Sequence, residues 1–172
     1  DVVFTTESFC GVISETALDA PRSVPAFIDE AVRRCNEQLW GNLTATLLVH
    51  PRSLADPEVA AAVDRAVEGL HYGTVGVNVW AGIGYVFVSP PWGAYAGNEL
   101  TDIQSGRGTA HNTFLLEDVE KTVIRGPWRP PITPPWLHTH RRMDRLSPLL
   151  ADLTLRLDPR KLAAMAWHGV LG

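Results

Sequence analysis

The sequence predicts an α/β fold in which strands alternate with helices and lie at least partly parallel. In two segments, apolar residues recur with the 3.6-residue period of an amphipathic helix, and short apolar runs of strand length stand on either side of each. The order over residues 12–79 is therefore strand, helix, strand, helix, strand, which is typical of a parallel sheet with helical crossovers. Right-handed crossovers place both helices on one face of the sheet, so the other face needs a different cover.

The first three elements open this alternation. Residues 12–18 are expected to form a short strand. Ser23 is expected to cap a helix over residues 24–39, whose apolar positions share one face, and Gly41 ends it. Residues 43–49 are an apolar run that predicts a strand buried on both faces.

The next elements are a helix over residues 57–69 and a strand over residues 74–79. Glycines and prolines make residues 80–112 a long irregular stretch, and a loop of this length in a compact domain is either functional or disordered. Its aromatic residues argue against disorder, because disordered chains are poor in them. These residues are Tyr85, Phe87, Trp92 and Tyr95. A last strand is expected over residues 119–125.

The remaining sequence differs in composition. Prolines in residues 126–136 predict a stiff, extended linker, and residues 142–156 and 159–168 are amphipathic helices. We therefore divide the chain into an α/β part, residues 1–126, and a proline-rich linker with a helical C-terminal extension, residues 127–172. The apolar stripe of these helices indicates packing against the parent domain or, alternatively, a subunit contact.

Composition excludes several classes of function. The chain has 172 residues, of which 45% are hydrophobic and 20% are charged, as in ordinary globular proteins. A net charge of −4 gives no basic surface for nucleic acid and no polybasic patch for a membrane. No apolar run approaches the roughly 18 residues of a membrane span. Two cysteines do not make a disulfide framework, which fits a cytoplasmic location. The first residue is not Met, so we expect a chain that starts inside a longer protein or was processed.

Five segments share an order and a set of glycine, aromatic and acidic positions with one enzyme family. They are Thr6-Glu7-Ser8-Phe9-Cys10-Gly11, Trp40-Gly41-Asn42-Leu43-Thr44-Ala45, Gly73-Thr74-Val75-Gly76-Val77-Asn78, Pro90-Pro91-Trp92-Gly93-Ala94-Tyr95 with the later Ser105-Gly106, and Val119-Glu120-Lys121-Thr122-Val123. Together they resemble the last third of the sequence of enzymes in the aldehyde dehydrogenase superfamily. Cys10 stands where the family has glycine and Gly11 where it has proline, and the loop between Tyr95 and Ser105 is longer and does not match the family's lysine. Because of these differences, the resemblance does not identify the aldehyde that is the substrate.

The resemblance implies a three-layer α/β/α catalytic domain, of which this chain supplies a partial sheet with flanking helices. It also implies an NAD- or NADP-dependent oxidoreductase that converts an aldehyde to a carboxylic acid through a cysteine thioester. In the family, the nucleophile, the general base and the nucleotide-binding domain lie upstream of the segment matched by Glu7. We therefore expect no catalytic residue in this chain, no cofactor bound to it alone, and a missing N-terminal part and a homo-oligomer as its partners.

The resemblance assigns cofactor binding to two residues. The Glu7 carboxylate is expected to accept hydrogen bonds from the ribose hydroxyls next to the nicotinamide, because its two oxygens suit two adjacent donors. The alternative is a solvated glutamate. Phe9 is expected to pack beside the nicotinamide, with a plain core aromatic as the alternative. The loop aromatics Tyr85, Phe87 and Trp92, with Tyr95, are expected to line the aldehyde entrance, or to pack against the missing half of the domain.

Other reactive residues carry weaker expectations. Cys10 has no neighbouring His or Lys to activate it, and Cys35 falls on the apolar face of its helix as a core residue. His138 and His140 lack a third ligand nearby, so we interpret them as surface residues and expect no metal site. Two rival functions remain: a non-catalytic interaction module that reuses the fold, and a degenerate relative that binds nucleotide without turnover.

Overall fold

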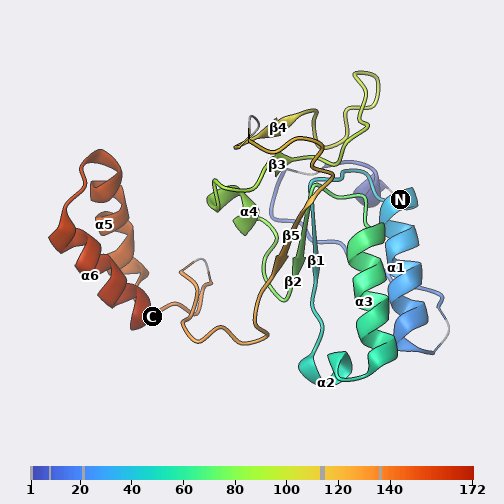
Figure 1. Cartoon of the computed structure of the whole chain (residues 1–172), viewed down its shortest axis with the longest axis horizontal. Helices are drawn as coiled ribbons and strands as arrows, with labels where there is room; N and C mark the ends of the chain where they lie inside the picture. Colours follow the sequence, from blue (N-terminus) through green and yellow to red (C-terminus); the bar gives the residue numbers. More distant parts are fainter. Residues whose placement is uncertain (1, 8, 21, 113–114, 136) are drawn as a thin grey trace. The chain divides into compact units, whose positions relative to one another are not determined.

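The structure of this chain is a computed structural model that describes residues 2–7, 9–20, 22–112, 115–135 and 137–172. The chain forms two compact units, Asp1–Trp128 and Arg129–Gly172 (Figure 1).

A parallel sheet organises the first unit. Its strands are β1 (Thr44–Leu47), β2 (Thr74–Val77) and β5 (Thr122–Arg125), arranged in the order β1-β2-β5. The register aligns Thr44 with Thr74, and Thr74 with Thr122. The predicted α/β fold with a small parallel sheet and flanking helices is therefore confirmed.

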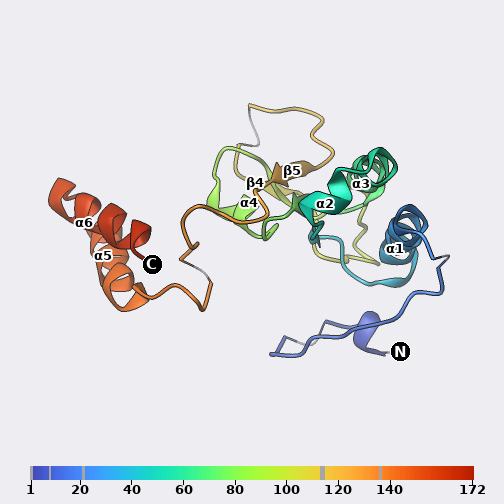
Figure 2. The ribbon, with the colours of Figure 1, turned by 90° about the horizontal axis from the view of Figure 1, so that it is seen from below.

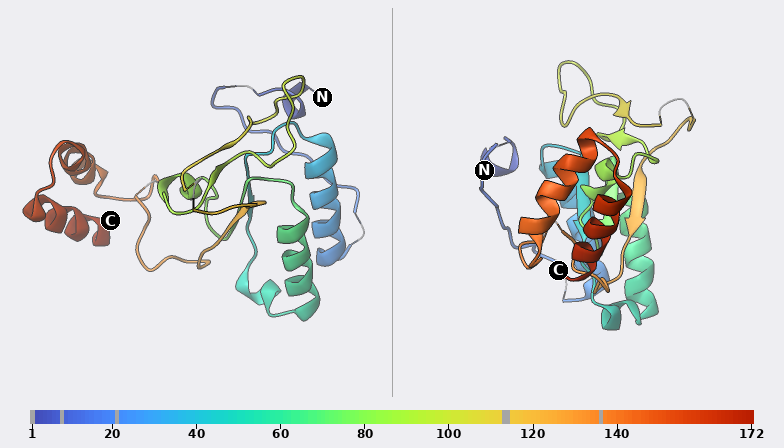
Figure 3. Two further views of the ribbon diagram at one scale, coloured as in Figure 1. Left: turned by 45° about the horizontal axis from the view of Figure 1, so that its top comes forward. Right: turned by 90° about the vertical axis from the view of Figure 1, so that its left-hand side faces the viewer.

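Two long helices cover one face of this sheet (Figures 1 and 3). They are α1 (Val24–Gln38) and α3 (Pro57–Gly69), and a single turn of helix, α2 (Pro51–Leu54), precedes α3. Ser23 caps α1 as predicted, because its Oγ accepts a hydrogen bond from the Ala26 amide at 3.2 Å. Asp56 caps α3 in the same way through the amide of Glu58.

The core lies between these helices and the sheet. Val63 and Val67 of α3 pack against Val75 and Val77 of the central strand β2, and all four are buried. Residues from α1, α2 and the β1 segment surround this cluster: Ile28, Val32, Cys35, Ala45, Leu47, Val49 and Leu54. Cys35 is thereby confirmed as a core residue. Burial on both faces explains why the β2 sequence is apolar without alternation.

The opposite face of the sheet is covered by the chain that follows β2. Gly76 is required there, because a Cβ at this position would lie 2.5 Å from the carbonyl oxygen of Val79. The Ala81 amide donates to the Thr46 Oγ1 at 3.1 Å, and the segment continues into the short helix α4 (Ile83–Val86). This segment therefore covers the face of the sheet that the two long helices leave open.

The long segment between β2 and β5 is mostly irregular, as predicted, but contains one small antiparallel pair of strands. β3 (Trp92–Gly93) pairs with β4 (Thr109–Ala110). Residues 96–106 between them project as a loop (Figure 3).

The predicted strand over residues 12–18 is wrong. This segment follows a short 3-10 helix, η1 (Val2–Phe4), and runs extended but unpaired, clear of the sheet (Figure 2). Its side chains are largely exposed, with Ile13 at 96%. Strand propensity alone does not form a strand, because the segment also needs a partner for its backbone groups.

The second unit is a helical hairpin of α5 (Met143–Leu155) and α6 (Pro159–Val170). Asp158 caps α6, and Lys161 ties the helices together by an ion pair with Asp152. His140 is only 5% exposed and its Nδ1 accepts the Arg142 amide, so the surface interpretation of this histidine is wrong. Among the described residues, no helix is long and apolar enough to cross a membrane.

Candidate functional site

A cavity of about 340 Å³ lies where the strands β2 and β5 begin. Its walls come from three segments that are far apart in sequence: residues 91–98, residues 106–109 and residues 119–122, with Gly73 at the entry to β2. Tyr95, Arg107, Glu120 and Lys121 contribute its charged and aromatic side chains.

Lys121 is the most buried of these charged side chains, at 8% exposure. Its ammonium group donates to the main-chain oxygens of Val67, Glu68 and Leu70, at 3.3, 2.6 and 2.8 Å. These carbonyls belong to the end of α3, where the last turn lacks partners within the helix and the helix dipole is negative. Lys121 therefore ties the start of β5 to the carboxyl end of α3.

Tyr95 and Glu120 form a hydrogen-bonded pair beside this lysine. The Tyr95 hydroxyl donates to the Glu120 Oε1 at 2.9 Å, and the Lys121 ammonium lies 3.1 Å from the same oxygen. The Tyr95 ring stacks on His71 with a centroid distance of 5.0 Å, and the lysine ammonium lies 5.5 Å from the ring centroid. These four side chains form one polar cluster, which we call the Tyr95 cluster.

The pairing shifts two pKa values in opposite directions. The Tyr95 hydrogen bond, with the neighbouring Lys121, lowers the pKa of Glu120 below its ordinary value of 4.5. The same hydrogen bond raises the pKa of Tyr95 above 10.0. Glu120 is therefore ionised and Tyr95 neutral at neutral pH. A carboxylate held this way is a hydrogen-bond acceptor and a poor proton acceptor.

Three main-chain segments approach one another closely and form the floor of the cavity. A Cβ on Gly73 would lie 1.8 Å from the carbonyl oxygen of Gly93, and a Cβ on Gly93 would lie 2.4 Å from that of Gly108. Only glycine fits at positions 73 and 93. The floor is therefore main chain, and recognition there depends on backbone groups and on the side chains at the rim.

The projecting loop is fixed to the entry of β1 by side-chain amides. Asn42 and Asn98 exchange two hydrogen bonds at 2.8 and 3.1 Å, and Asn98 also donates to the Gly106 oxygen at 2.7 Å. The Asn42 amide donates to the Ser105 Oγ at 2.8 Å, and the Gly41 amide to the Gln104 Oε1 at 2.7 Å. These bonds order a loop that has little apolar burial.

Glu7 lies exposed in the N-terminal segment and lines a small hollow of about 170 Å³. The other walls include Phe4, Trp40, Gly41 and Ser105. The Trp40 amide donates to the Phe4 oxygen at 2.9 Å, which holds the N-terminal segment beside this hollow. The structure thus brings Glu7 next to two other segments that carry the resemblance.

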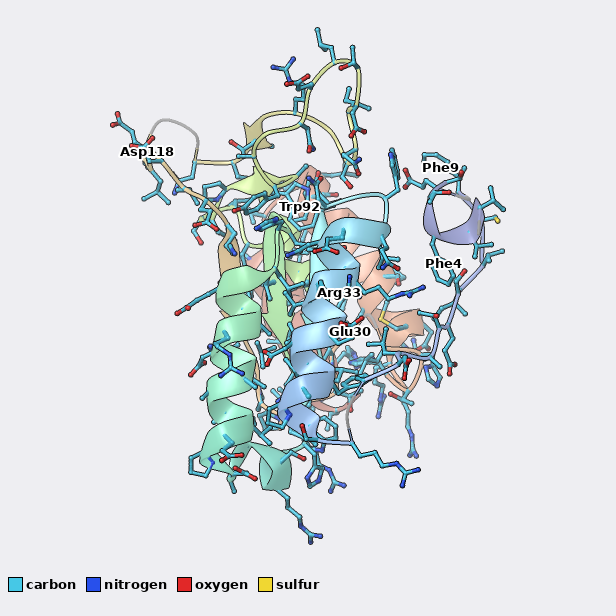
Figure 4. All side chains as sticks on the ribbon, turned by 90° about the vertical axis from the view of Figure 1, so that its right-hand side faces the viewer. Phe4, Phe9, Glu30, Arg33, Trp92 and Asp118 are labelled. Carbon is cyan, nitrogen blue, oxygen red and sulfur yellow. The ribbon has the colours of Figure 1, made fainter. Side chains whose placement is uncertain are left out.

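Phe9 does not pack in a core. It is 88% exposed, with a φ of 46°, and projects from the outside of the N-terminal segment, whereas Trp92 lies within the unit (Figure 4). The alternative of a plain core aromatic is therefore wrong.

The four loop aromatics do not form one wall. Tyr85 meets Trp92 edge to face at a centroid distance of 5.7 Å, and it also contacts His111 at 5.3 Å. Tyr95 belongs to the Tyr95 cluster, and Phe87 is 47% exposed. The entrance predicted for all four is thus divided between two places in the first unit.

Three residues of the Tyr95 cluster were not predicted as site residues. Glu120 and Lys121 belong to one of the five segments that resemble the family, but their sequence indicates only a strand. His71 lies between the helix α3 and the strand β2. The one available signal is a lysine directly before an apolar strand, which does not reveal the helix end that the lysine caps.

The described residues contain no group of three or more His, Cys, Asp or Glu side chains placed to hold a metal ion. Cys10 is exposed and Cys35 is half-buried, and burial raises the pKa of the Cys35 thiol. Comparisons with protein-family models, with curated proteins and with solved structures found no match to this chain.

Proposed function

We propose that this chain is the later part of the catalytic domain of an NAD- or NADP-dependent aldehyde dehydrogenase, a cytoplasmic oxidoreductase. The complete enzyme oxidises an aldehyde to a carboxylic acid through a cysteine thioester, and the present chain alone is inactive. One observation carries the proposal. Four of the five segments that resemble the family, although distant in sequence, meet through direct hydrogen bonds at the amino ends of β1, β2 and β5.

These hydrogen bonds run through Asn42 and Gly73. The Asn42 oxygen accepts from the Gly73 amide at 3.0 Å and from the Tyr95 amide at 3.1 Å. The Asn42 amide reaches Ser105, and the Gly73 oxygen accepts from Thr122 at 2.9 Å. Four of the five segments are thereby joined, and the fifth, which contains Glu7, shares the hollow lined by Gly41 and Ser105.

In this proposal Glu7 binds the ribose beside the nicotinamide. Its carboxylate is exposed and lies at a hollow with room for a small polar group, about 170 Å³. Phe9, two residues on, is an exposed ring that a planar cofactor would cover. The missing N-terminal part supplies the nucleophile, the general base and the rest of the cofactor site.

A second candidate function is a non-catalytic interaction module. Exposed apolar side chains in the N-terminal segment favour it, namely Phe9 at 88%, Val12 at 57% and Ile13 at 96%, because large exposed apolar residues in groups mark interaction surfaces. The same exposure also fits a domain whose other half is absent, and the complete protein distinguishes these explanations.

The test is aldehyde-dependent formation of NADH or NADPH by the longest protein that contains this chain, assayed with short and long aliphatic and aromatic aldehydes. We expect the parent protein to be active and Glu7→Gln to bind the cofactor about tenfold or more weakly. The reason is that a hydrogen bond to a charged acceptor contributes roughly 1.5–3 kcal/mol. Glu15→Gln is the matched control, an exposed glutamate in the same segment, and it should leave affinity unchanged.

Two results would count against the proposal in different ways. If no aldehyde reduces either nucleotide and neither nucleotide binds, the enzyme proposal fails and the interaction module gains support. If activity is present but Glu7→Gln binds cofactor as the parent does, the family stands and the role of Glu7 is wrong.

A further inference from the structure

Arg34 is a half-buried cation for which the chain supplies no counter-ion. Its Nε is buried without a hydrogen-bond partner among the described residues, and none of their ion pairs includes Arg34. Its guanidinium carbon lies 5.6 Å from the centroid of the Phe4 ring, which attracts a cation but does not replace a hydrogen-bond acceptor. A buried charged donor without an acceptor is costly, so this one calls for an acceptor from outside the chain.

Two acidic side chains stand close to Arg34 in the sequence of α1, and both are already paired. Both oxygens of Glu30 accept hydrogen bonds from Arg33, at 2.8 and 2.5 Å, and Glu37 pairs with Arg33 at 2.9 Å. Figure 4 shows Arg33 and Glu30 next to each other on α1. The Arg33 hydrogen bonds are also the main cause that lowers the pKa of Glu30, whereas Arg34 acts on this carboxylate only at longer range. Arg33 thus takes the carboxylates that Arg34 could have used.

Arg34 lines a cavity of about 340 Å³ between α1 and the N-terminal segment, which we call the Arg34 cavity. Phe27 and Ala31 line it from α1, and Phe4 and Leu18 line it from the N-terminal segment. The walls are thus largely apolar around one cation. Small-molecule sites have this composition and a volume of roughly 300–1,000 Å³, with a few polar groups that fix the orientation of the ligand.

The positions of the wall residues along α1 set the length of a matching ligand. Phe27, Ala31 and Arg34 follow the spacing of one helix face. At about 1.5 Å per residue, Phe27 and Arg34 are about 10 Å apart along the helix axis. Phe27 is 50% exposed, so apolar surface remains to be covered at that end. An anionic head at Arg34 with an apolar tail about 10 Å long therefore fits this wall.

A carboxylate matches the head position better than a phosphate group does. A guanidinium can donate two parallel hydrogen bonds to one carboxylate, and the single charge of Arg34 balances a monoanion. Among the described residues that line the cavity, only Arg34 is a charged side chain, whereas a phosphate group carries nearly two negative charges at neutral pH. The Ser14 hydroxyl also lines the cavity and offers a further hydrogen-bond donor.

We propose that the Arg34 cavity binds a medium-chain aliphatic carboxylate, such as octanoate. The carboxylate lies on the Arg34 guanidinium, and the aliphatic chain runs past Ala31 to Phe27. This inference does not depend on the proposed enzymatic activity, because these three residues line neither the Glu7 hollow nor the cavity at the Tyr95 cluster.

The first test is isothermal titration calorimetry of the full chain with sodium octanoate, kept below its micelle-forming concentration. We expect saturable binding of a single octanoate per chain. Arg34→Met keeps an apolar stem and removes the charge, so it should weaken binding about tenfold or more. Arg65→Met is the matched control, because Arg65 is an exposed arginine on α3 that pairs with Asp29 at 3.1 Å, and it should leave the affinity unchanged.

Further ligands test the head and the tail separately. Octanol lacks the charge and butanoate lacks most of the tail, so each should bind about tenfold or more weakly than octanoate. Octanoate that binds equally to Arg34→Met and to the parent would overturn the proposal, because the site would then be a nonspecific apolar surface. Inorganic phosphate that binds as tightly as octanoate would overturn the choice of ligand, and absence of saturable octanoate binding would overturn the site.

NMR on the unmodified chain gives an independent readout that needs no variant. Bound octanoate should shift the Arg34 Nε–H resonance, slow its exchange with water, and shift the Ala31 methyl resonance. Both titrations should follow the dissociation constant found by calorimetry. Unchanged resonances of both groups across the titration would contradict binding in this cavity even if Arg34→Met failed to fold.

Discussion

Asn78 pairs its side-chain amide with the main chain of Val49 through two reciprocal hydrogen bonds. The Val49 amide donates to the Asn78 Oδ1 at 2.8 Å, and the Asn78 Nδ2 donates to the Val49 oxygen at 3.0 Å. The side chain thus continues the pairing of β1 with β2 past the last residues of both strands. Asparagine is also suited to the left-handed backbone there, with a φ of 57°.

Replacing this residue should destabilise the first unit. Asn78→Ala removes both hydrogen bonds and leaves a half-buried main-chain pair without partners, so we expect a loss of about 1–3 kcal/mol in the free energy of unfolding. Urea unfolding followed by circular dichroism measures it. Asn78→Asp keeps the acceptor for the Val49 amide and tolerates the same φ, and should lose less. Equal losses for both variants would show that the donor bond alone matters.

Lys121 is expected to stabilise the fold through the helix end that it caps. Lys121→Met keeps the apolar stem but removes three hydrogen bonds to the end of α3, so we expect a loss of about 2–3 kcal/mol. Arg33→Met is the control, because Arg33 is half-exposed on α1 and its ion pairs with Glu30 and Glu37 lie at the surface, where solvent screening leaves them little effect on stability. Similar melting shifts for both variants would refute a special role for the lysine.

Gly73 is expected to tolerate no side chain. Gly73→Ala places a Cβ 1.8 Å from the Gly93 oxygen, and both partners are main chain that cannot move without shifting β2 or β3. We expect a loss of about 3 kcal/mol or more, or failure to fold. Gly11→Ala, which meets nothing within 4 Å, should have little effect. A normally stable Gly73→Ala protein would disprove the close approach of these segments.

The Tyr95–Glu120 pair should make stability depend on pH at both ends of the scale. The pKa of Glu120 is lowered in the folded state, so its contribution is present above its ordinary value of 4.5 and disappears as pH falls through the folded pKa. The pKa of Tyr95 is raised, so its contribution is present below 10.0 and disappears as pH rises through the folded pKa.

Tyr95→Phe isolates this effect because it keeps the ring that stacks on His71. The stability difference between parent and variant should be largest at intermediate pH and shrink in acid and in strong base. An NMR titration should also show the Glu120 carboxyl pKa rising toward 4.5 in the variant. A difference that stays constant across pH, with an unchanged Glu120 pKa, would exclude the hydrogen bond as its cause.

The elements that the sequence predicts correctly are those whose signals are local. Ser23 caps α1 through its own hydroxyl, and α3 buries the apolar positions that its period predicts, such as Val63 and Val67. The run over residues 74–79 predicts a strand, and β2 forms within it. The run over residues 43–49 also forms a strand, β1, but the predicted burial on both faces is wrong there, since Leu48 is 72% exposed. These signals depend on residues within a few positions of one another, so they are readable without knowing the fold.

The candidate site was less predictable, because its contacts join distant residues. Lys121 reaches carbonyls 51 to 54 positions earlier in the chain, and nothing in its own surroundings indicates that a helix ends there. Tyr95 was expected beside Tyr85 and Trp92, yet it lies with Glu120 because its hydroxyl finds a carboxylate partner 25 positions later. The prediction of a strand over residues 12–18 was wrong for a related reason, because a strand also requires a neighbouring strand that pairs with its backbone groups.

By itself the sequence determined which long segments are helical and which can be strands, because periodicity and caps act within a few residues of each other, whereas the short helices α2 and α4 carry no such signal. Only the tertiary structure decided which of those strands are paired, which face of the sheet each segment covers and which polar side chains meet. Those outcomes depend on the hydrogen-bond partners and packing surfaces that remain free once the chain has closed on itself. Glu120, Lys121 and His71 became a cluster with Tyr95 in this way.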